Sequence, residues 1–178
     1  MKNILRYGLT LFIICAIAGG VLAYTYETTQ KVIEVNKMRE KTLLLKELIP
    51  DASDFVSSSN KPNSFDPLVT IKEIYIAKKD GKEVGKVWEV STKGYSSEIV
   101  LLVAVNDSGA IEKVKVVSQQ ETPGLGTEVT KDNFLGQFIG KKEANLEVKK
   151  NIKPVSGATI SSSAVVRAIN EVLKHNKI

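Results

Sequence analysis

The sequence predicts an α+β protein in which a single N-terminal transmembrane helix precedes one domain with a mainly antiparallel sheet and peripheral helices. An uncharged apolar run follows Arg6, a two-residue hydrophobic period begins near Leu68, and a helical period appears near the C-terminus. We therefore expect an anchor at 1–26, a juxtamembrane helix and loop at 27–67, and a folded domain at 68–178.

The apolar run lies between Arg6 and Glu27 and contains no charged residue. Its length matches the ~20 residues that a helix needs to cross a bilayer. A cleaved signal peptide is the alternative, because Lys2 and Arg6 form a basic start and Val21-Leu22-Ala23 is an acceptable cleavage site. We favour a retained anchor. The positively charged start predicts a cytoplasmic N-terminus, with the rest of the chain on the extracytoplasmic side of the cell (inner) membrane.

Two segments connect the anchor to the domain. Glu27 to Leu48 has the pattern of a polar helix, which Pro50 ends. Ala52 to Pro67 is rich in Ser, Asn, Asp and Pro, which predicts a loop that could instead cover an edge of the domain.

The domain begins with strand patterns that pair most simply as an antiparallel sheet. Asp80-Gly81 is a hairpin signal, and Asp107-Ser108-Gly109 predicts a second turn. A nearly continuous apolar run at Ile99–Val105 predicts a central strand. The strands are expected at Val69–Ala77, Glu83–Val90, Ile99–Val105 and Ile111–Val117, with a further short one at Leu146–Val148. A short amphipathic helix is expected at Lys131–Ile139, with Phe134, Leu135 and Phe138 facing inward.

Composition limits the chemistry. Cys15, the only cysteine, lies in the apolar run, so the chain has no internal disulfide and no cysteine-ligated cluster. His175, the only histidine, is expected to be a helix-end or tail residue. The net charge of +5 comes from scattered lysines, which disfavours nucleic acid and permits weak attraction to membrane lipid. With a single cysteine and a single histidine, any electron carrier bound by this chain would have to be organic.

A hydroxyl-rich stretch, Ser156–Ser162, directly precedes the last helical pattern. Orphan N–H groups and the helix dipole favour an anion at such a helix start, whereas a plain Ser/Thr cap is the simpler interpretation. Ala164, Val165, Ala168, Ile169, Val172 and Leu173 form the apolar face, and Arg167, Asn170, Glu171 and Lys174 the polar one.

Two other loops have permissive backbones. Glu121–Gly126 places Pro123 before Gly124 and Gly126, and Gly94–Ile99 opens the central strand. Each is typical of an ordinary turn by itself, although the first could let backbone approach a flat ligand and the second offers the ring of Tyr95.

Together these stretches resemble a known family. Ser156-Gly157-Ala158-Thr159-Ile160-Ser161-Ser162 resembles the flavinylation motif of the FMN-binding domain in the G subunit of the Rnf electron-transport complex, which the C subunit of the sodium-pumping NADH:quinone reductase shares. Gly94–Ile99 and Glu121–Gly126 match further family stretches in the same order. The resemblance spans nearly the whole chain. Lys153 stands where the family usually has Asp.

The resemblance implies that Thr159 carries FMN through a covalent phosphoester bond, with the neighbouring motif residues cradling the phosphate and the two other loops bordering the flavin. The implied cofactor-binding set is Thr159, Ser156, Gly157, Ala158, Ile160, Ser161, Tyr95, Glu98, Glu121, Thr122, Gly124, Leu125 and Gly126. Glu121 could contact the flavin or only brace its loop.

The implied function is electron relay in a translocase that passes electrons between ferredoxin and NAD and couples this to sodium or proton movement. Its partners would be integral-membrane and iron–sulfur subunits and a flavin-attaching transferase, and the chain would have no independent active site. The equivalent quinone-reductase subunit and a tethered scaffold module without redox chemistry are the alternatives.

Overall fold

The computed structural model describes residues 2–176, without the side chains at 2–5, 27–28, 31–32, 34–35 and 37–38. The chain divides into two compact units, Met1–Leu44 and Leu45–Ile178. Helix α1 provides the whole described part of the first unit. The second unit contains the sheet and the remaining helices.

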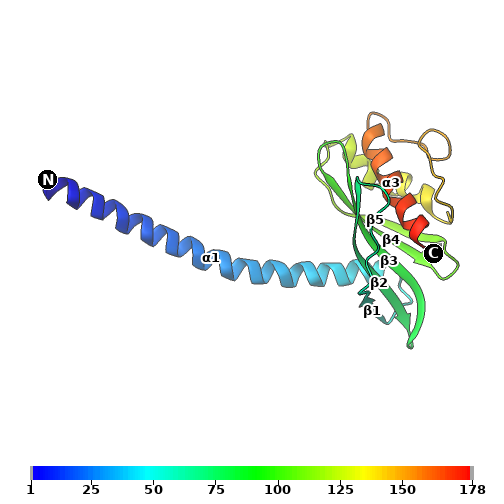
Figure 1. The fold of residues 1–178 in the computed structure, drawn as a ribbon, viewed down its shortest axis with the longest axis horizontal. Helices are drawn as coiled ribbons and strands as arrows, with labels where there is room; N and C mark the ends of the chain where they lie inside the picture. The colour runs from blue at the N-terminus through cyan, green and yellow to red at the C-terminus, as the bar shows by residue number, and fades with distance from the viewer. Residues whose placement is uncertain (1, 177–178) are drawn as a thin grey trace. The chain divides into compact units, whose positions relative to one another are not determined.

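Helix α1 (Lys2–Leu48) runs without interruption through both predicted helical segments, as its continuous ribbon shows in Figure 1. Within it, Arg6–Tyr26 is long and apolar enough to cross a membrane, with 21 residues and a mean hydropathy of 2.0. No side chain of that stretch is buried within the protein, as expected for a helix whose apolar surface meets lipid. The helix ends just before Pro50, as predicted.

The second unit is built on a five-stranded antiparallel sheet in the order β1-β2-β3-β4-β5 (Figure 1). The strands are β1 (Asp54–Ser57), β2 (Val69–Lys79), β3 (Lys82–Lys93), β4 (Glu98–Asn106) and β5 (Ile111–Ser118). Sequential strands are neighbours throughout, so short turns suffice to connect most of them. Asp80 and Gly81 both have positive φ, 51° and 80°, which is the conformation of the tight hairpin turn that the sequence predicted.

The segment predicted as a loop at 52–67 contains a short strand. In β1, Phe55 pairs with Ala77 of β2 and so covers the otherwise open edge of the sheet. The expected strand at Leu146–Val148 is wrong, because only an isolated bridge between Val148 and Ile152 forms there. The carbonyl of Glu147 accepts N–H groups from Lys150 and Ile152, so this backbone closes on itself in a turn.

Helix α3 (Thr159–His175) packs on one face of the sheet (Figure 1). Its predicted apolar face is confirmed, since Ala164, Val165, Ala168, Ile169, Val172 and Leu173 are all fully buried. The predicted polar face is wrong at Glu171, whose side chain is also fully buried.

Contacts with the loop between β1 and β2 explain the burial of Glu171. The Glu171 carboxylate accepts hydrogen bonds from the Ser64 hydroxyl, at 2.8 Å, and from the Phe65 N–H. His175 ends the helix, and its ring stacks on Phe65 with centroids 4.5 Å apart. His175 is therefore a helix-end residue, but a packed one whose side chain is only 6% exposed.

Strand β4 is buried on both faces, as its continuous apolar run predicted. Its alternate residues Leu101 and Val103 face the core under α3. Leu102 and Ala104 face the other way, where Leu48 and Ile49 at the end of α1 are also buried. Each face of this strand thus contributes apolar burial to the second unit.

Two short helices, α2 (Asp132–Leu135) and η2 (Gly136–Phe138), replace the single helix predicted at Lys131–Ile139. A further short helix, η1 (Gly126–Thr130), directly precedes them. The predicted inward residues are confirmed, because Phe134, Leu135 and Phe138 are buried and the two phenylalanine rings meet edge to face at 5.5 Å.

Candidate functional site

A cavity of about 420 Å³ lies where the N-terminus of α3 meets the two glycine-containing loops. This volume falls in the usual range for small-molecule sites. Its walls come entirely from the residues that the sequence singled out as cofactor-binding: Tyr95, Glu121, Thr122, Leu125, Gly126, Gly157, Ala158, Thr159, Ile160 and Ser161. Segments far apart in the sequence are therefore brought together in one place.

The start of α3 leaves hydrogen-bond donors available at this cavity. Thr159 is the first helical residue, and the N-cap position belongs to Ala158, with no side chain capping the helix in the described structure. The first N–H with an intrahelical partner is that of Ser162, which donates to the Ala158 carbonyl at 2.9 Å. The plain Ser/Thr cap considered from the sequence is therefore wrong. The first-turn N–H groups and the positive end of the dipole suit an anion.

The hydroxyls of the motif have different surroundings. Ser162 is buried, and its hydroxyl accepts the Val155 N–H at 3.0 Å and donates to the Ala158 carbonyl at 2.9 Å. Ser161 is buried and donates to Glu121. Thr159 is exposed and lines the cavity.

Glu121 joins three segments around the cavity. Its carboxylate accepts the N–H groups of Ser96 and Ser97, each at 3.0 Å, and the Ser161 hydroxyl at 2.6 Å. The side chain is 4% exposed. Burial alone would raise the pKa of Glu121, but the Ser161 hydroxyl and the N–H groups of Ser97, Ser96 and Tyr95 outweigh it and lower the pKa. The carboxylate is thus charged at neutral pH and braces the loop.

Three glycines around the cavity have neighbouring side chains packed directly against their backbone. A Cβ on Gly126 would lie 2.7 Å from both Cβ and Oε2 of Glu121, and one on Gly94 would lie 2.5 Å from its Oε1. Gly157 has a φ of 76°, and a Cβ there would lie 2.9 Å from Cδ2 of Leu125. A side chain at any of these positions would intrude on the cluster that shapes the cavity.

The remaining predicted residues divide into those on the cavity and those away from it. Tyr95, which is 68% exposed, lies on the rim with its ring available for stacking. Glu98 lies elsewhere: its carboxylate pairs with Lys72 at 3.0 Å, and its pKa is lowered by hydrogen bonds from Ser91 and then Lys72. Ser156 and Gly124 are exposed but do not line the cavity.

Sequence reasoning missed Gln137 as a supporting residue. Its side chain donates to the carbonyl of Lys153 at 3.1 Å and accepts the Lys153 N–H at 2.8 Å. This two-point contact fixes the backbone three residues before the motif. Because it uses only main-chain atoms of Lys153, the unusual lysine side chain does not take part in it.

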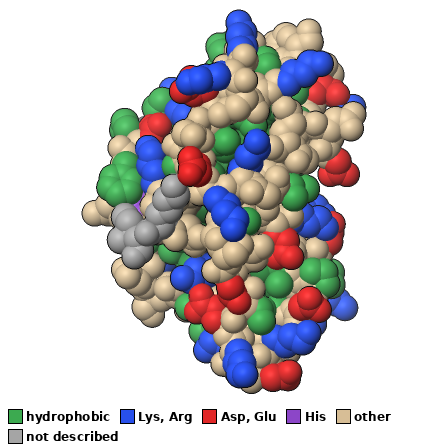
Figure 2. All heavy atoms as spheres, turned by 90° about the vertical axis from the view of Figure 1, so that its right-hand side faces the viewer, with side chains coloured by type: hydrophobic (Ala, Val, Ile, Leu, Met, Phe, Trp, Pro, Cys, Tyr) green, Lys and Arg blue, Asp and Glu red, His purple; other side chains and the backbone are tan. Residues whose placement is uncertain are grey.

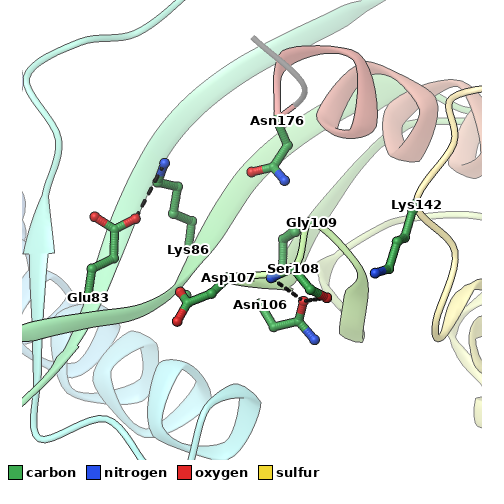
Figure 3. Close-up of a pocket in the computed structure, with 10 residues that line it drawn as sticks. Glu83, Lys86, Asn106, Asp107, Ser108, Gly109, Lys142 and Asn176 are labelled. Carbon is green, nitrogen blue, oxygen red and sulfur yellow. Dashed lines mark hydrogen bonds and ion pairs between the residues drawn. The ribbon is translucent and has the colours of Figure 1, made fainter.

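A second cavity, of about 440 Å³, lies by the turn between β4 and β5 (Figure 3). Its polar side chains largely serve one another: Lys86 pairs with Glu83 at 3.4 Å, and Asn106 accepts hydrogen bonds from the N–H and hydroxyl of Ser108. Lys142 and Asn176 face it from the other side in Figure 3. It has no helix N-terminus, so the cavity at Thr159 is the better site for a phosphorylated ligand.

Charge and metal ligands add two observations. On the face drawn in Figure 2, basic side chains are interspersed with acidic ones. Among the described residues, His, Cys, Asp and Glu side chains form no cluster of three or more that could bind a metal ion. The cavity is lined by hydroxyl, backbone amide and carboxylate groups together with Leu125 and Ile160. An uncapped helix start, an exposed threonine and closely packed glycines fit a phosphate monoester attached to a flat ring.

Comparisons with known proteins cover both units of the chain. The FMN-binding domain family matches residues 94–174, and the family described as the RnfG N-terminal region matches residues 1–48. The first of these matches contains every residue that lines the cavity.

Whole-length relatives are also found. The G subunit of a proton-translocating ferredoxin:NAD(+) oxidoreductase complex from Clostridium ljungdahlii is 36% identical over 170 residues, covering 92% of this chain and 86% of the relative. The G subunit of an ion-translocating oxidoreductase complex from Methanosarcina acetivorans is 34% identical, covering 98% and 95%. The G subunit of a Na(+)-translocating ferredoxin:NAD(+) oxidoreductase complex from Acetobacterium woodii is 30% identical, covering 95% and 89%. The crystal structure of Shewanella oneidensis NqrC matches with a TM-score of 0.49 at 25% identity, covering 73% of each chain.

Proposed function

The chain belongs to the family of G subunits of Rnf-type ion-translocating oxidoreductase complexes, and we propose that it relays electrons through FMN bound covalently to Thr159. One observation carries the proposal: Thr159 is exposed and lines a ligand-sized cavity, at the uncapped start of α3. A phosphoester at its hydroxyl oxygen would lie beside the donors that an anion needs.

The residues around Thr159 have separable roles in this proposal. The N–H groups of the first turn of α3 bind the phosphate, and Gly157 lets the backbone approach it. Tyr95 and Leu125 border the ring at the rim of the cavity. Bound FMN supplies the reversible electron transfer. Attachment through the phosphate keeps the cofactor in place without altering its ring.

The partners that we propose for this chain are the other subunits of an Rnf-type complex in the membrane. We infer that the chain assembles with integral-membrane and iron–sulfur subunits and acts as a translocase component without an active site of its own. The Clostridium ljungdahlii and Acetobacterium woodii relatives belong to ferredoxin:NAD(+) oxidoreductase complexes that translocate protons and Na(+), respectively. The apolar stretch Arg6–Tyr26 serves as the single-pass anchor in the inner membrane. A flavin-attaching transferase loads Thr159.

Intact-mass measurement tests the attachment. The full chain, produced together with the transferase, should gain the mass of one FMN less one water, and Thr159→Ala should lose that gain completely. Ser163→Ala is the matched control, because Ser163 lies on the same helix but outside the cavity wall, and it should keep the flavin. An unmodified protein from native membranes would favour the scaffold module instead.

Orientation needs a separate experiment. In a Cys15→Ser background, Lys61→Cys places one thiol at an exposed position of the second unit. We expect a membrane-impermeant maleimide to label it in intact spheroplasts, because the short basic start predicts a cytoplasmic N-terminus. Labelling only after lysis would reverse the proposed orientation.

A further inference from the structure

The carboxylate of Glu121 lies on the wall of the cavity, yet its oxygens are occupied by the protein. Oε1 accepts the N–H groups of Ser96 and Ser97 at 3.0 Å each. Oε2 accepts the Ser161 hydroxyl at 2.6 Å and the Tyr95 N–H at 3.4 Å. An ionised carboxylate has roughly four acceptor positions, so these donors fill it.

The same contacts fix the position of the carboxylate. Its side chain is 4% exposed, and Gly94 and Gly126 pack against it so closely that neither position has room for a methyl group. The carboxylate is the acceptor in each of these hydrogen bonds, which favours its ionised form. The bonds therefore lower the pKa of Glu121 despite its burial. A negative charge is therefore held rigidly at the wall of the proposed flavin site.

We propose that Glu121 is a positioning residue that makes no hydrogen bond to the flavin and that its fixed charge lowers the reduction potential of FMN bound in this cavity. The inference rests on the proposed function. Electrons added to a bound ring meet a nearby negative charge in a partly dehydrated site, where Coulomb interactions are stronger than in water. The charge thus makes the bound cofactor a stronger reductant than it would be beside a neutral side chain.

The second part of the inference concerns Ser161 and the turn at 94–97. Without the carboxylate, the N–H groups of Ser96 and Ser97 lose their acceptor and the Ser161 hydroxyl loses its partner. Glutamine preserves the shape of the side chain, and its oxygen can still accept the N–H groups of Ser96 and Ser97. Its NH₂ can donate to the Ser161 hydroxyl but opposes the Tyr95 N–H that Oε2 accepted. Glu121→Gln therefore removes both the charge and part of the brace.

Glu171 offers a matched control. It is also a buried glutamate that accepts a serine hydroxyl and a backbone N–H, but it does not line the cavity. The flavin-loaded full chain, Glu121→Gln and Glu171→Gln are titrated with dithionite in the presence of mediators. We expect the midpoint potential to shift upward in Glu121→Gln and to stay unchanged in Glu171→Gln. Equal potentials in the wild type and Glu121→Gln would overturn the electrostatic part.

Ser161→Ala covers the case in which Glu121→Gln does not load flavin. This variant keeps the charge but removes a hydrogen bond that stabilises it, so the pKa of Glu121 rises. In a plot of midpoint potential against pH, the potential should rise where Glu121 becomes protonated and loses its charge. In Ser161→Ala this rise should occur at a higher pH than in the wild type. A rise at the same pH in both proteins would overturn the proposal.

Amide hydrogen exchange on the flavin-free full chain separates this inference from the proposed function. The amides of Ser96 and Ser97 should exchange on the order of ten-fold faster in Glu121→Ala, which removes their acceptor, than in the wild type, and at the wild-type rate in Glu171→Ala. Unchanged exchange in Glu121→Ala would refute the positioning role whether or not the protein carries flavin. Absence of flavin from the wild type, with the exchange result as expected, would refute only the proposed function.

Discussion

The hydroxyl of Ser161 donates a 2.6 Å hydrogen bond to the carboxylate of Glu121, which lies 40 residues earlier in the chain. Both side chains are buried, at 1% and 4% exposure. This bond ties the first turn of α3 to the loop at 121–126, and the N–H groups of Ser96 and Ser97 extend the link to the start of β4. The cavity therefore depends on one carboxylate that three segments share.

The pH dependence of stability should reflect this carboxylate. Because the pKa of Glu121 is lower in the folded protein than its ordinary value of 4.5, its contribution is fully present above that value. It is lost as the pH falls through the folded pKa. Glu121→Gln should therefore flatten the acid limb of the unfolding free energy, measured by urea denaturation at several pH values. An acid limb as steep as that of the wild type would contradict this expectation.

Gly126→Ala should distort the loop that forms one wall of the cavity. The new methyl group would lie 2.7 Å from Glu121, so the loop must shift, and we expect a loss of about 1–3 kcal/mol and weaker flavin loading. Gly136→Ala is the control, because no atom lies within 4 Å of its Cβ and its φ is −61°. That variant should be neutral or more stable by up to about 1 kcal/mol in the same urea titration.

Glu171→Ala should release the loop between β1 and β2. It leaves the Ser64 hydroxyl and the Phe65 N–H without their acceptor, at a cost of about 1–3 kcal/mol. Limited proteolysis should then cut within 58–67 sooner than in the wild type. Glu147→Ala removes an exposed ion pair with Lys150 and should change the unfolding free energy by less than about 1 kcal/mol. Equal proteolysis of the two variants would count against the loop contact.

Phe138→Ala should be among the most destabilising single substitutions in the second unit. The side chain is fully buried and meets Phe134 edge to face at 5.5 Å. Truncation of a buried phenylalanine removes that contact and leaves a cavity, which costs about 3–5 kcal/mol. Chemical denaturation measures the loss, and a change below about 1 kcal/mol would mean that the surrounding helices collapse into the space.

Local patterns were enough to predict most of the fold. The two-residue period located β2, β3 and β5, a continuous apolar run located β4, and Asp80-Gly81 located the first hairpin of these strands. The short strand β1 was not predicted, because its four residues carry no clear alternation and pair only when the edge of β2 is present. Two short helices, α2 and η2, formed in place of one helix because backbone hydrogen bonds, which periodicity does not report, close them locally.

The sequence motifs identified the residues around the cavity but not which of their side chains bind one another. The buried hydroxyl of Ser161 and the carboxylate of Glu121 bind each other, a pairing across 40 residues that no local pattern encodes. Glu98 was grouped with the site because it belongs to the stretch Gly94–Ile99 that resembles the family, yet its carboxylate pairs with Lys72. Glu171 was assigned to a solvated face because the loop that covers it comes from a distant part of the sequence.

Trp88 is the only tryptophan in the chain, and it is buried beside His175, 6.1 Å between ring centroids, at the C-terminal end of α3. Thr159 begins the same helix, whose 17 residues extend about 25 Å. Indole emission overlaps flavin absorption, so FMN attached at Thr159 as proposed would form an energy-transfer pair with Trp88, which packs near the other end of α3. Quenching of that emission would report flavin loading in real time without any added dye.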